Sequence, residues 1–523
     1  MQKLSFDPIE LELFKNIFVS ISEEMGAVLG RTAISPNIKE RKDYSCALFN
    51  SHGETFAQGS HIPVHLGAMP LSVQSSIQSV PFENRDLVIL NDPYQGGTHL
   101  PDITCISPVY VGNRLAFFVA NRAHHSDVGG MTPGSMPLAS EIFQEGLIVP
   151  PVKLVRKGIL DEDIFQLILS NVRTPEERKG DILAQIAANN TGIKRLEETL
   201  KKYGHTKLVR HGQYIQDYTE KILRKTLLSI PEGNYSFSDF MDNDGITDKP
   251  VKIAVDIHIK GEEAILDFSS SSEQVTGGVN ANFAVTCSAV LYVFRSLVEE
   301  DIPFNTGLMR PIRVIAPQGS VVNAQHPAAT AGGNVETSQR IVDVILGALS
   351  QAIPDRIPAA SSGTMNNVAF GGWDPAKKSR FTYYETIGGG MGASRERNGL
   401  SGVHTHMTNS LNTPMEALEN YLPIRIKTYK LREASGGKGR RRGGKGILRE
   451  YEFFVPTQVS ILSDRRKFAP FGILGGSKGK KGRNTLIVSK GRKKILGSKV
   501  NLTAQPGDIL RIETPGGGGY GKK

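Results

Sequence analysis

The chain has few cysteines, no long apolar run and no signal-peptide pattern in its first residues. It has 523 residues but three cysteines (Cys46, Cys105 and Cys287), too few for a disulfide framework and suited to a reducing compartment. No apolar run approaches the roughly 18–20 residues of a membrane-spanning helix. Residues 1–13 mix acids with apolar residues and have neither the basic start nor the apolar core of a signal peptide. We therefore expect a cytoplasmic protein without a membrane segment.

A nucleotide-binding motif is also missing. Residues 439–445 imitate the spacing of a phosphate loop, but Gly446 stands where Ser or Thr should hold Mg²⁺. Residues 447–454 have the pattern of a strand, whereas a phosphate loop needs a helix N-terminus to cradle the anion. We therefore reject a phosphate loop here. If the reaction uses ATP, another polypeptide supplies the ATP site.

The basic charge is confined to one segment. The net charge is +10, yet residues 436–500 hold 18 Lys and Arg against 3 Asp and Glu, so the rest of the chain is acidic by 5. Such a segment could bind nucleic acid, dock an acidic partner subunit or form a solvated rim. Aromatic residues are sparse within it, which disfavours nucleic acid. We favour the docking face, with the solvated rim as its alternative.

Hydrophobic periodicity predicts an α+β protein. A helix is expected near residues 11–25 and helices over 160–228, 280–297 and 336–353. Strands are expected at 44–49, 87–90, 114–120, 235–240, 253–259 and 264–268. The predicted fold is a multi-layer mixed α/β fold with a β-rich, glycine-rich C-terminal region. The expected domains are 1–230 with the functional site, 231–430 as an α+β domain, and 431–523 as a basic β-rich region packed on the others.

Two polar segments after buried strands carry the candidate site. Residues 91–102 contain His99 and Asp102, and residues 121–127 contain His124, His125 and Asp127. Imidazole together with carboxylate favours a divalent ion such as Zn²⁺, Mn²⁺ or Fe²⁺. Two loops at strand ends can meet and form one such site.

The metal hypothesis takes its ligands from both segments. His99, Asp102 and His124 are the expected ligands, and Asp43 is a further candidate carboxylate. His125 and Asp127 would then act in acid/base catalysis or orient the ligands. In the alternative interpretation the aspartates are turn residues and the histidines only form hydrogen bonds in loops.

A second polar cluster contains His404, His406 and Asn409. A His-x-His pair on a strand places both rings on one face. The cluster could line the same pocket, bind substrate or hold a second ion. Its alternative is a polar strand followed by a loop that caps a helix.

Two further features have simple interpretations. Cys105 lies among apolar neighbours, which favours an inert buried thiol over a nucleophile. Residues 516–520, four glycines and Tyr520, are most simply a flexible tail, whose tyrosine could still contact the fold or a partner. The glycine pairs at 436–437 and 475–476, with Gly479, suggest exposed hairpins.

Several segments together resemble the hydantoinase B/oxoprolinase family. The resemblance runs in order along the whole chain and rests on residues 41–47, 91–102, 124–130, 409–419, 432–446 and 514–521. Such long co-linear agreement is more specific than any single motif. It is carried in particular by Asn91-Asp92-Pro93, Gly97-Thr98-His99-Leu100-Pro101-Asp102 and His124-His125-Ser126-Asp127.

The resemblance implies an enzyme of two subunits. Members of this family open cyclic amides such as 5-oxoproline, hydantoins or caprolactam together with an ATP-binding hydantoinase A-type subunit. Phosphorylation of the carbonyl oxygen in that partner would activate the ring for attack in this chain. A related acetone carboxylase α subunit carries a metal on residues that match His99, Asp102 and a histidine of the 124–125 pair. The implied protein is a hetero-oligomer with Zn²⁺ or Mn²⁺, or else Fe²⁺, in this chain and ATP in the partner. A carboxylase subunit and a non-catalytic scaffold with a structural metal are the alternatives.

Overall fold

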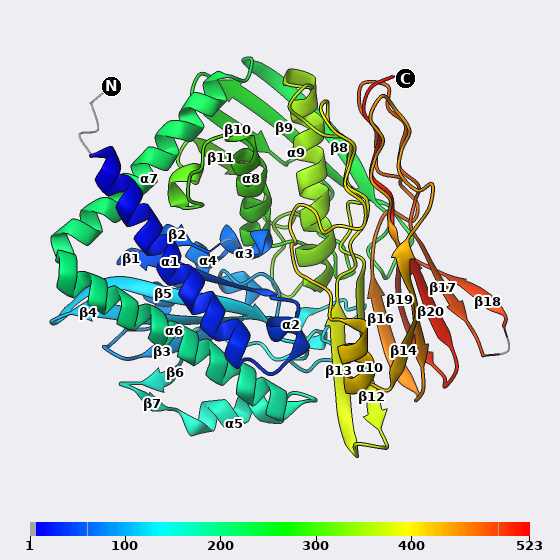
Figure 1. Cartoon of the computed structure of the whole chain (residues 1–523), viewed down its shortest axis with the longest axis horizontal. Coiled ribbons are helices and arrows are strands. Elements are labelled where there is room, and N and C mark those ends of the chain that lie inside the picture. The colour runs from blue at the N-terminus through cyan, green and yellow to red at the C-terminus, as the bar shows by residue number, and fades with distance from the viewer. Residues whose placement is uncertain (1–6, 60, 490, 523) are drawn as a thin grey trace.

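A seven-stranded sheet organises the N-terminal part of the protein, which is described by a computed structural model covering residues 7–59, 61–489 and 491–522 (Figure 1). Residues 1–6 of the N-terminal segment considered above, and Lys490 of the basic segment, lie outside this description. The strand order is β2-β1-β5-β4-β3-β6-β7, with every neighbouring pair antiparallel. The strands are β1 (Tyr44–Asn50), β2 (Thr55–Gln58), β3 (Leu87–Leu90), β4 (Asp102–Val111), β5 (Arg114–His124), β6 (Val152–Arg156) and β7 (Ile159–Leu160).

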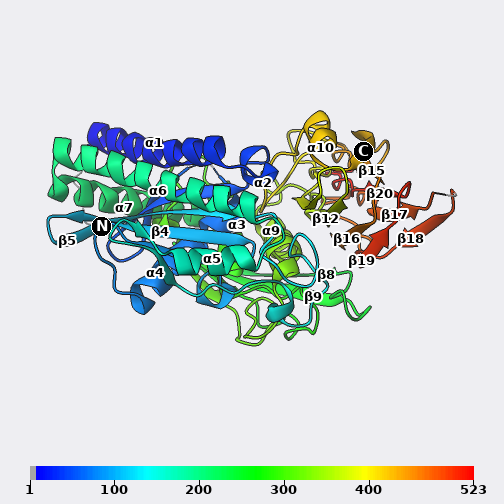
Figure 2. The same ribbon diagram turned by 90° about the horizontal axis from the view of Figure 1, so that it is seen from below.

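Helices cover both faces of this sheet. Figure 2 shows α1, α6 and α7 side by side on one face and α3 and α4 on the other. Alternate residues of β1 supply the two cores: Cys46 and Leu48 pack with α1 and α6, whereas Ala47 and Phe49 pack with α4. The helices are α1 (Pro8–Thr32), α2 (Pro36–Lys39), α3 (Pro63–Leu66), α4 (Met69–Ser79), α5 (Glu162–Ser170), α6 (Pro175–Tyr203) and α7 (His205–Leu228).

The middle of the chain forms a four-stranded sheet, β11-β10-β9-β8, against two buried helices. Its strands are β8 (Gly233–Met241), β9 (Val251–Lys260), β10 (Glu263–Asp267) and β11 (Ile312–Ile315). The helices are α8 (Phe283–Leu297) and α9 (Ser338–Ala352), and a π-helical turn (Gly333–Thr337) precedes α9. Short 3-10 turns occur at Pro93–Gln95, Ile142–Gln144 and Thr306–Met309.

The C-terminal part is two sheets that share one apolar core. One has the order β13-β12-β16-β19 and the other β14-β15-β20-β17-β18. The elements are β12 (Asn367–Asp374), β13 (Ser379–Glu385), α10 (Met415–Tyr421), β14 (Ile424–Leu431), β15 (Ile447–Phe453), β16 (Thr457–Leu462), β17 (Arg483–Ile487), β18 (Lys493–Leu496), β19 (Lys499–Ala504) and β20 (Ile509–Glu513).

The predicted α+β class is confirmed. The expected helices and strands occur at their places, and β15 follows Gly446 where a phosphate loop would require a helix. The expected helical segment over 160–228 is divided into α5, α6 and α7. Within the described ranges, no helix combines the length and the apolar character needed to cross a membrane.

The expectation of a flexible glycine tail is wrong. Residues 516–520 are buried, and their backbone packs directly against other glycine-rich segments. A Cβ on Gly517 would stand 2.0 Å from the Met391 carbonyl oxygen, and one on Gly443 would stand 2.0 Å from the Gly517 carbonyl oxygen. Gly437 and Gly479, expected in exposed hairpins, are buried in the same packing. Only glycine lets extended backbones approach this closely.

A buried ion network joins the middle sheet to the C-terminal part. Asp239 on β8 lies 2.8 Å from both Arg340 on α9 and Arg465 after β16. Arg340 also pairs with Asp464 at 3.0 Å, and Lys499 on β19 pairs with Asp464 at 2.9 Å. Burial alone would raise the pKa of Asp239, but Arg465 and Arg340 lower it to about 2. Its charge therefore stabilises the folded state.

We predict that Gly517→Ala destabilises the protein by about 1–3 kcal/mol or more, because its Cβ would collide with backbone that cannot move aside. Gly497→Ala is the matched control, since its Cβ would meet no atom closer than 3.4 Å. Urea midpoints of the two variants measure the difference. Equal midpoints would mean that the glycine packing is loose.

We predict that Asp239 makes stability depend on pH in the acid range. Its folded pKa of about 2 is below its ordinary 3.8, so its contribution is complete above about pH 4 and is lost as the pH falls through 2. Asp239→Asn should remove roughly 2 kcal/mol of that pH dependence. Urea unfolding at pH 6, 4 and 3 tests this, with the exposed Asp301→Asn as the control. An unchanged slope in Asp239→Asn would contradict the ion network.

Candidate metal centre

Strand register places two of the predicted ligands opposite each other. Asp102 is the first residue of β4 and His124 the last of β5, and the antiparallel register pairs them directly. Side chains paired in this way share a face of the sheet and lie about 5 Å apart at their Cβ atoms. The Asp102 Oδ1 and His124 Nδ1 atoms are 3.0 Å apart.

A tight turn before β4 brings His99 to the same point. The Asp102 backbone N–H donates to the His99 carbonyl oxygen, and the side chain of Asn282 donates to the carbonyl oxygens of Gly97 and Thr98. His99 Nε2 consequently lies 3.2 Å from Asp102 Oδ1 and 3.2 Å from His124 Nδ1. All three side chains are buried.

The three donor atoms suit one divalent ion. Ligands about 2.0–2.2 Å from an ion, at tetrahedral or octahedral angles, are separated by about 3.0–3.4 Å. The separations of 3.0, 3.2 and 3.2 Å among His99, Asp102 and His124 fall in this range. Within the described residues, these three side chains form a group whose ligand atoms all lie within 4.8 Å of one another, close enough to hold one metal ion.

Asp102 is the anionic centre of the site. A third imidazole, His65 on α3, lies 3.4 Å from its Oδ2, and the side chains of Thr98 and Asn334 donate to the same oxygen. Burial would raise the pKa of Asp102, but the neighbouring His99, His65 and His124 hold it well below its ordinary value. The carboxylate is therefore ionised and able to bind a cation at neutral pH.

The surroundings of the cluster leave polar atoms without partners. His99 Nδ1 and His124 Nε2 are buried and have no hydrogen-bond partner among the described residues. The His124 ring stacks on Tyr384, with centroids 4.4 Å apart, and the Arg41 guanidinium lies 5.1 Å from the Tyr384 ring centre. Burial lowers the pKa of His124, which keeps its imidazole neutral as a metal ligand requires. The two unpartnered nitrogens are not the donor atoms of the triangle: they are the second nitrogens of the ligand rings, which a polar partner usually orients in metal sites.

Asp43 lies beside the cluster and outside the ligand group. Its backbone carbonyl accepts a hydrogen bond from the His124 N–H, and its carboxylate lies 3.5 Å from Arg41. Arg41 also donates to Tyr384, Thr386 and Ser410. These contacts favour a role for Asp43 in positioning Arg41.

His125 and Asp127 make their contacts elsewhere. His125 Nε2 lies 2.9 Å from Gln185 Oε1 on α6, since adjacent residues of a strand face opposite sides. Burial, with the nearby Arg178, lowers the pKa of His125 to about 4. Asp127 accepts hydrogen bonds from the backbone N–H groups of Gly129, Gly134 and Arg173 and from the Arg173 guanidinium. The structure therefore does not bring either side chain to the three-residue group.

The segment with His404, His406 and Asn409 is a turn, so the expected strand is wrong. His406 has a φ of +59°, which is incompatible with a strand. The turn packs on the helix that carries His65: the Val64 N–H donates to the Met407 carbonyl oxygen, and Asn409 donates to the His61 carbonyl oxygen. His404 and His406 each have a buried Nε2 without a partner among the described residues.

Three residues of the site escaped sequence analysis: His65, Asn334 and Glu145. His65 and Asn334 contact Asp102, as described above. Burial raises the pKa of Glu145 to about 7, although it accepts hydrogen bonds from the Ala331 and Thr330 N–H groups. His65 and Asn334 lie in short helical turns without a motif, so the sequence offered no signal for them. The inert-thiol interpretation of Cys105 agrees with its burial, which raises its pKa.

Comparison with known proteins identifies the family. The profile of the hydantoinase B/oxoprolinase family matches residues 7–523. The chain belongs to the hydantoinase B/oxoprolinase family. The family expected from the sequence motifs, and with it the expectation of an enzyme, is confirmed.

Relatives of this family member have named activities. It is 41% identical over 544 residues to 5-oxoprolinase 1 of Arabidopsis thaliana, covering 98% of this chain but 42% of that protein. A crystal structure of an ATP-dependent caprolactamase from Pseudomonas jessenii matches with a TM-score of 0.91 and 28% identity over 99% of this chain and 92% of the other. A nucleotide-free acetone carboxylase matches with a TM-score of 0.90 over 98% of this chain and 76% of the other. At 18% identity, that likeness shows a shared fold.

We predict that His124→Gln abolishes stoichiometric metal binding, because it removes one donor of the triangle. The loss of affinity should exceed the ~10–100-fold that the partners of metal ligands contribute. The measurement is metal content per folded chain after dialysis against Zn²⁺ or Mn²⁺. His125→Gln is the matched control and should keep the metal, because His125 faces Gln185. Equal metal content in both variants would contradict the proposed ligand set.

Proposed function

We propose that this hydantoinase B/oxoprolinase family member is the metal-containing subunit of an ATP-dependent cyclic amide hydrolase. The observation that supports this most strongly is the buried triangle of His99, Asp102 and His124, in a chain whose relatives are named for opening cyclic amides. The substrate class is 5-oxoproline, a hydantoin or a related lactam.

The donor set accounts for the chemistry that ring opening needs. A lactam resists hydrolysis because attack on its carbonyl carbon breaks amide resonance. A divalent ion, Zn²⁺ or Mn²⁺, supplies Lewis-acid polarisation and a lowered pKa of water when bound at such a site. His99, Asp102 and His124 would hold the ion, while His65, Thr98 and Asn334 orient the Asp102 carboxylate.

Substrate recognition is assigned to the 404–409 turn and its surroundings. His404 is neutral because burial, with the nearby Arg41, lowers its pKa to about 4. Its unpartnered Nε2, and that of His406, can donate to or accept from a ring amide. Asn409 already donates to the His61 carbonyl oxygen, so we assign it to holding the turn.

Proton transfer is assigned to Glu145. His125 is hydrogen-bonded to Gln185, and Asp127 is hydrogen-bonded to Arg173, so neither is assigned this role. Glu145 instead has a pKa of about 7, the value at which a group gives and takes protons most effectively near neutral pH. Its charge also interacts with His99, which links it to the metal ligands.

The ATP-dependent step is assigned to a separate subunit. This chain corresponds to 42% of the Arabidopsis 5-oxoprolinase, so most of that relative has no counterpart here. The structural relative from Pseudomonas jessenii is an ATP-dependent enzyme. Because β15 occupies the place of the helix that a phosphate loop needs, we propose a hydantoinase A-type partner that binds ATP.

We predict that the purified chain opens a cyclic amide, tested with 5-oxoproline and hydantoins, only together with its ATP-binding partner, with ADP and the ring-opened product formed in step. Asp102→Asn should lower turnover by at least about 100-fold while circular dichroism stays unchanged. Product analysis with and without bicarbonate distinguishes a carboxylase. Bicarbonate-dependent consumption of ketones, or full turnover by Asp102→Asn, would contradict the proposal.

A further inference from the structure

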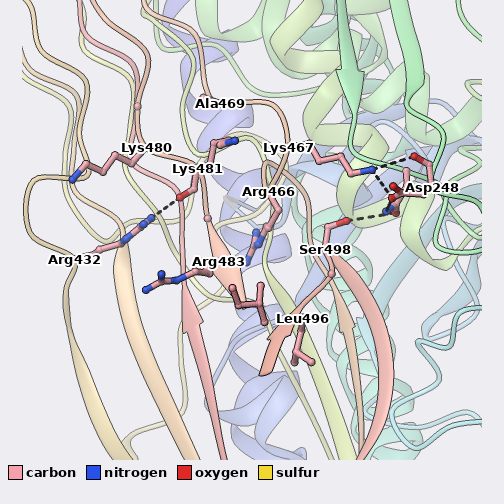
Figure 3. A pocket seen from close by; sticks show the side chains of 15 residues that line it. Asp248, Arg432, Arg466, Lys467, Ala469, Lys480, Lys481, Arg483, Leu496 and Ser498 are labelled. Atoms are coloured by element: carbon pink, nitrogen blue, oxygen red, sulfur yellow. Dashed lines mark hydrogen bonds and ion pairs between the residues drawn. The ribbon is translucent and has the colours of Figure 1, made fainter. Parts of the chain in front are cut away.

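A cavity of about 760 Å³ lies between the C-terminal sheets and the loop after β8. Six of the residues that line it are cationic: Arg432, Arg466, Lys467, Lys480, Lys481 and Arg483. Asp248 is the carboxylate on its wall. Figure 3 shows Arg466 between the Lys467–Asp248 pair on one side and Arg432 and Arg483 on the other. None of these residues belongs to the candidate metal centre.

The positive charge of this cavity is only partly neutralised. Lys467 pairs with Asp248, and Arg432 and Arg483 share Glu513 at 3.4 and 2.6 Å. Lys480 and Lys481 have no ion pair among the described residues, and both are exposed. Three of the six cations thus pair with Asp248 or Glu513, whereas Arg466, Lys480 and Lys481 have no ion pair within 4.0 Å among the described residues.

The floor of the cavity is a fixed guanidinium. The Arg466 guanidinium donates hydrogen bonds of 2.6–2.7 Å to three oxygens. These are the side-chain oxygens of Asn366 and Asn484 and the backbone carbonyl oxygen of Asp464. Gly482 packs over it so closely that a Cβ there would stand 2.9 Å from Arg466 Cζ. Burial lowers the pKa of Arg466 to about 10, although Glu336, Asp242 and Asp464 lie near it, so it stays charged at neutral pH. Arg466 therefore adds a fixed positive charge to the wall of the cavity.

We propose that this cavity binds a small polyphosphate, either inorganic or the tail of a nucleotide. Guanidinium groups bind phosphate oxygens in pairs, and lysine ammonium groups add mobile point charges around them. The volume is in the range of ~300–1,000 Å³ of small-molecule sites. The site is separate from the ATP site assigned to the partner subunit, and it does not depend on the proposed ring-opening activity.

Isothermal titration of the purified full chain with pyrophosphate, inorganic phosphate and ATP, at constant ionic strength, tests the proposal. Pyrophosphate should bind more tightly than phosphate. The double variant Lys480→Gln/Lys481→Gln should raise the pyrophosphate Kd by about tenfold or more, because it removes two charged donors. Equal binding of ATP and pyrophosphate would identify the polyphosphate tail as the recognised group, and binding of pyrophosphate alone would identify an inorganic ligand.

The matched control is Lys493→Gln/Lys494→Gln, which removes the same charge from exposed positions on β18 outside the cavity. It should leave the Kd unchanged. If both double variants weakened pyrophosphate binding equally, the effect would come from the net charge of the protein and not from the cavity, and the proposal would be overturned. Absence of pyrophosphate binding would overturn the proposal. If Lys480→Gln/Lys481→Gln then also assembled more weakly with the partner subunit, the cavity would be a docking surface for an acidic protein segment.

Discussion

The antiparallel register of β4 and β5 is the constraint on which the candidate metal centre depends. It pairs Asp102 with His124, and a slip of one residue would turn Asp102 to the other face of the sheet. Because helices bury both faces, such a slip would also move each apolar side chain from the core in which it fits to the core on the opposite face. The register is therefore fixed by the whole N-terminal sheet. The His99 turn and the Asp102 carboxylate act within that fixed frame, where the buried charge is balanced by imidazoles.

The site is completed by parts of the chain that are far apart in sequence. His65 comes from α3, Asn334 from the turn before α9, and Tyr384 from β13 of the C-terminal part. The buried ion network around Asp239 and the glycine packing around Gly517 hold those parts together. The geometry of the metal centre thus depends on the assembly of the entire chain. This agrees with a family match that runs from residue 7 to residue 523.

Sequence predicted what local pattern determines. The strand before Asn91, the strand over residues 114–120, and the helix with Phe14 and Phe18 on its buried face follow from periodicity. In the structure β5 continues beyond the predicted strand to His124. What it could not predict depends on contacts between distant segments. His65 lies in a four-residue helix without a motif. The glycines at 516–519 have a flexible composition, and only backbone-to-backbone packing buries them. Likewise, the opposite directions of His124 and His125 require the exact end of β5.

The most direct test of the central claim is a crystal structure of the chain grown with Mn²⁺ or Zn²⁺, with anomalous scattering measured at the absorption edge of the metal. The account predicts one strong anomalous peak about 2.0–2.2 Å from His99 Nε2, Asp102 Oδ1 and His124 Nδ1. A peak elsewhere in the chain, or none at these atoms under saturating metal, would contradict it.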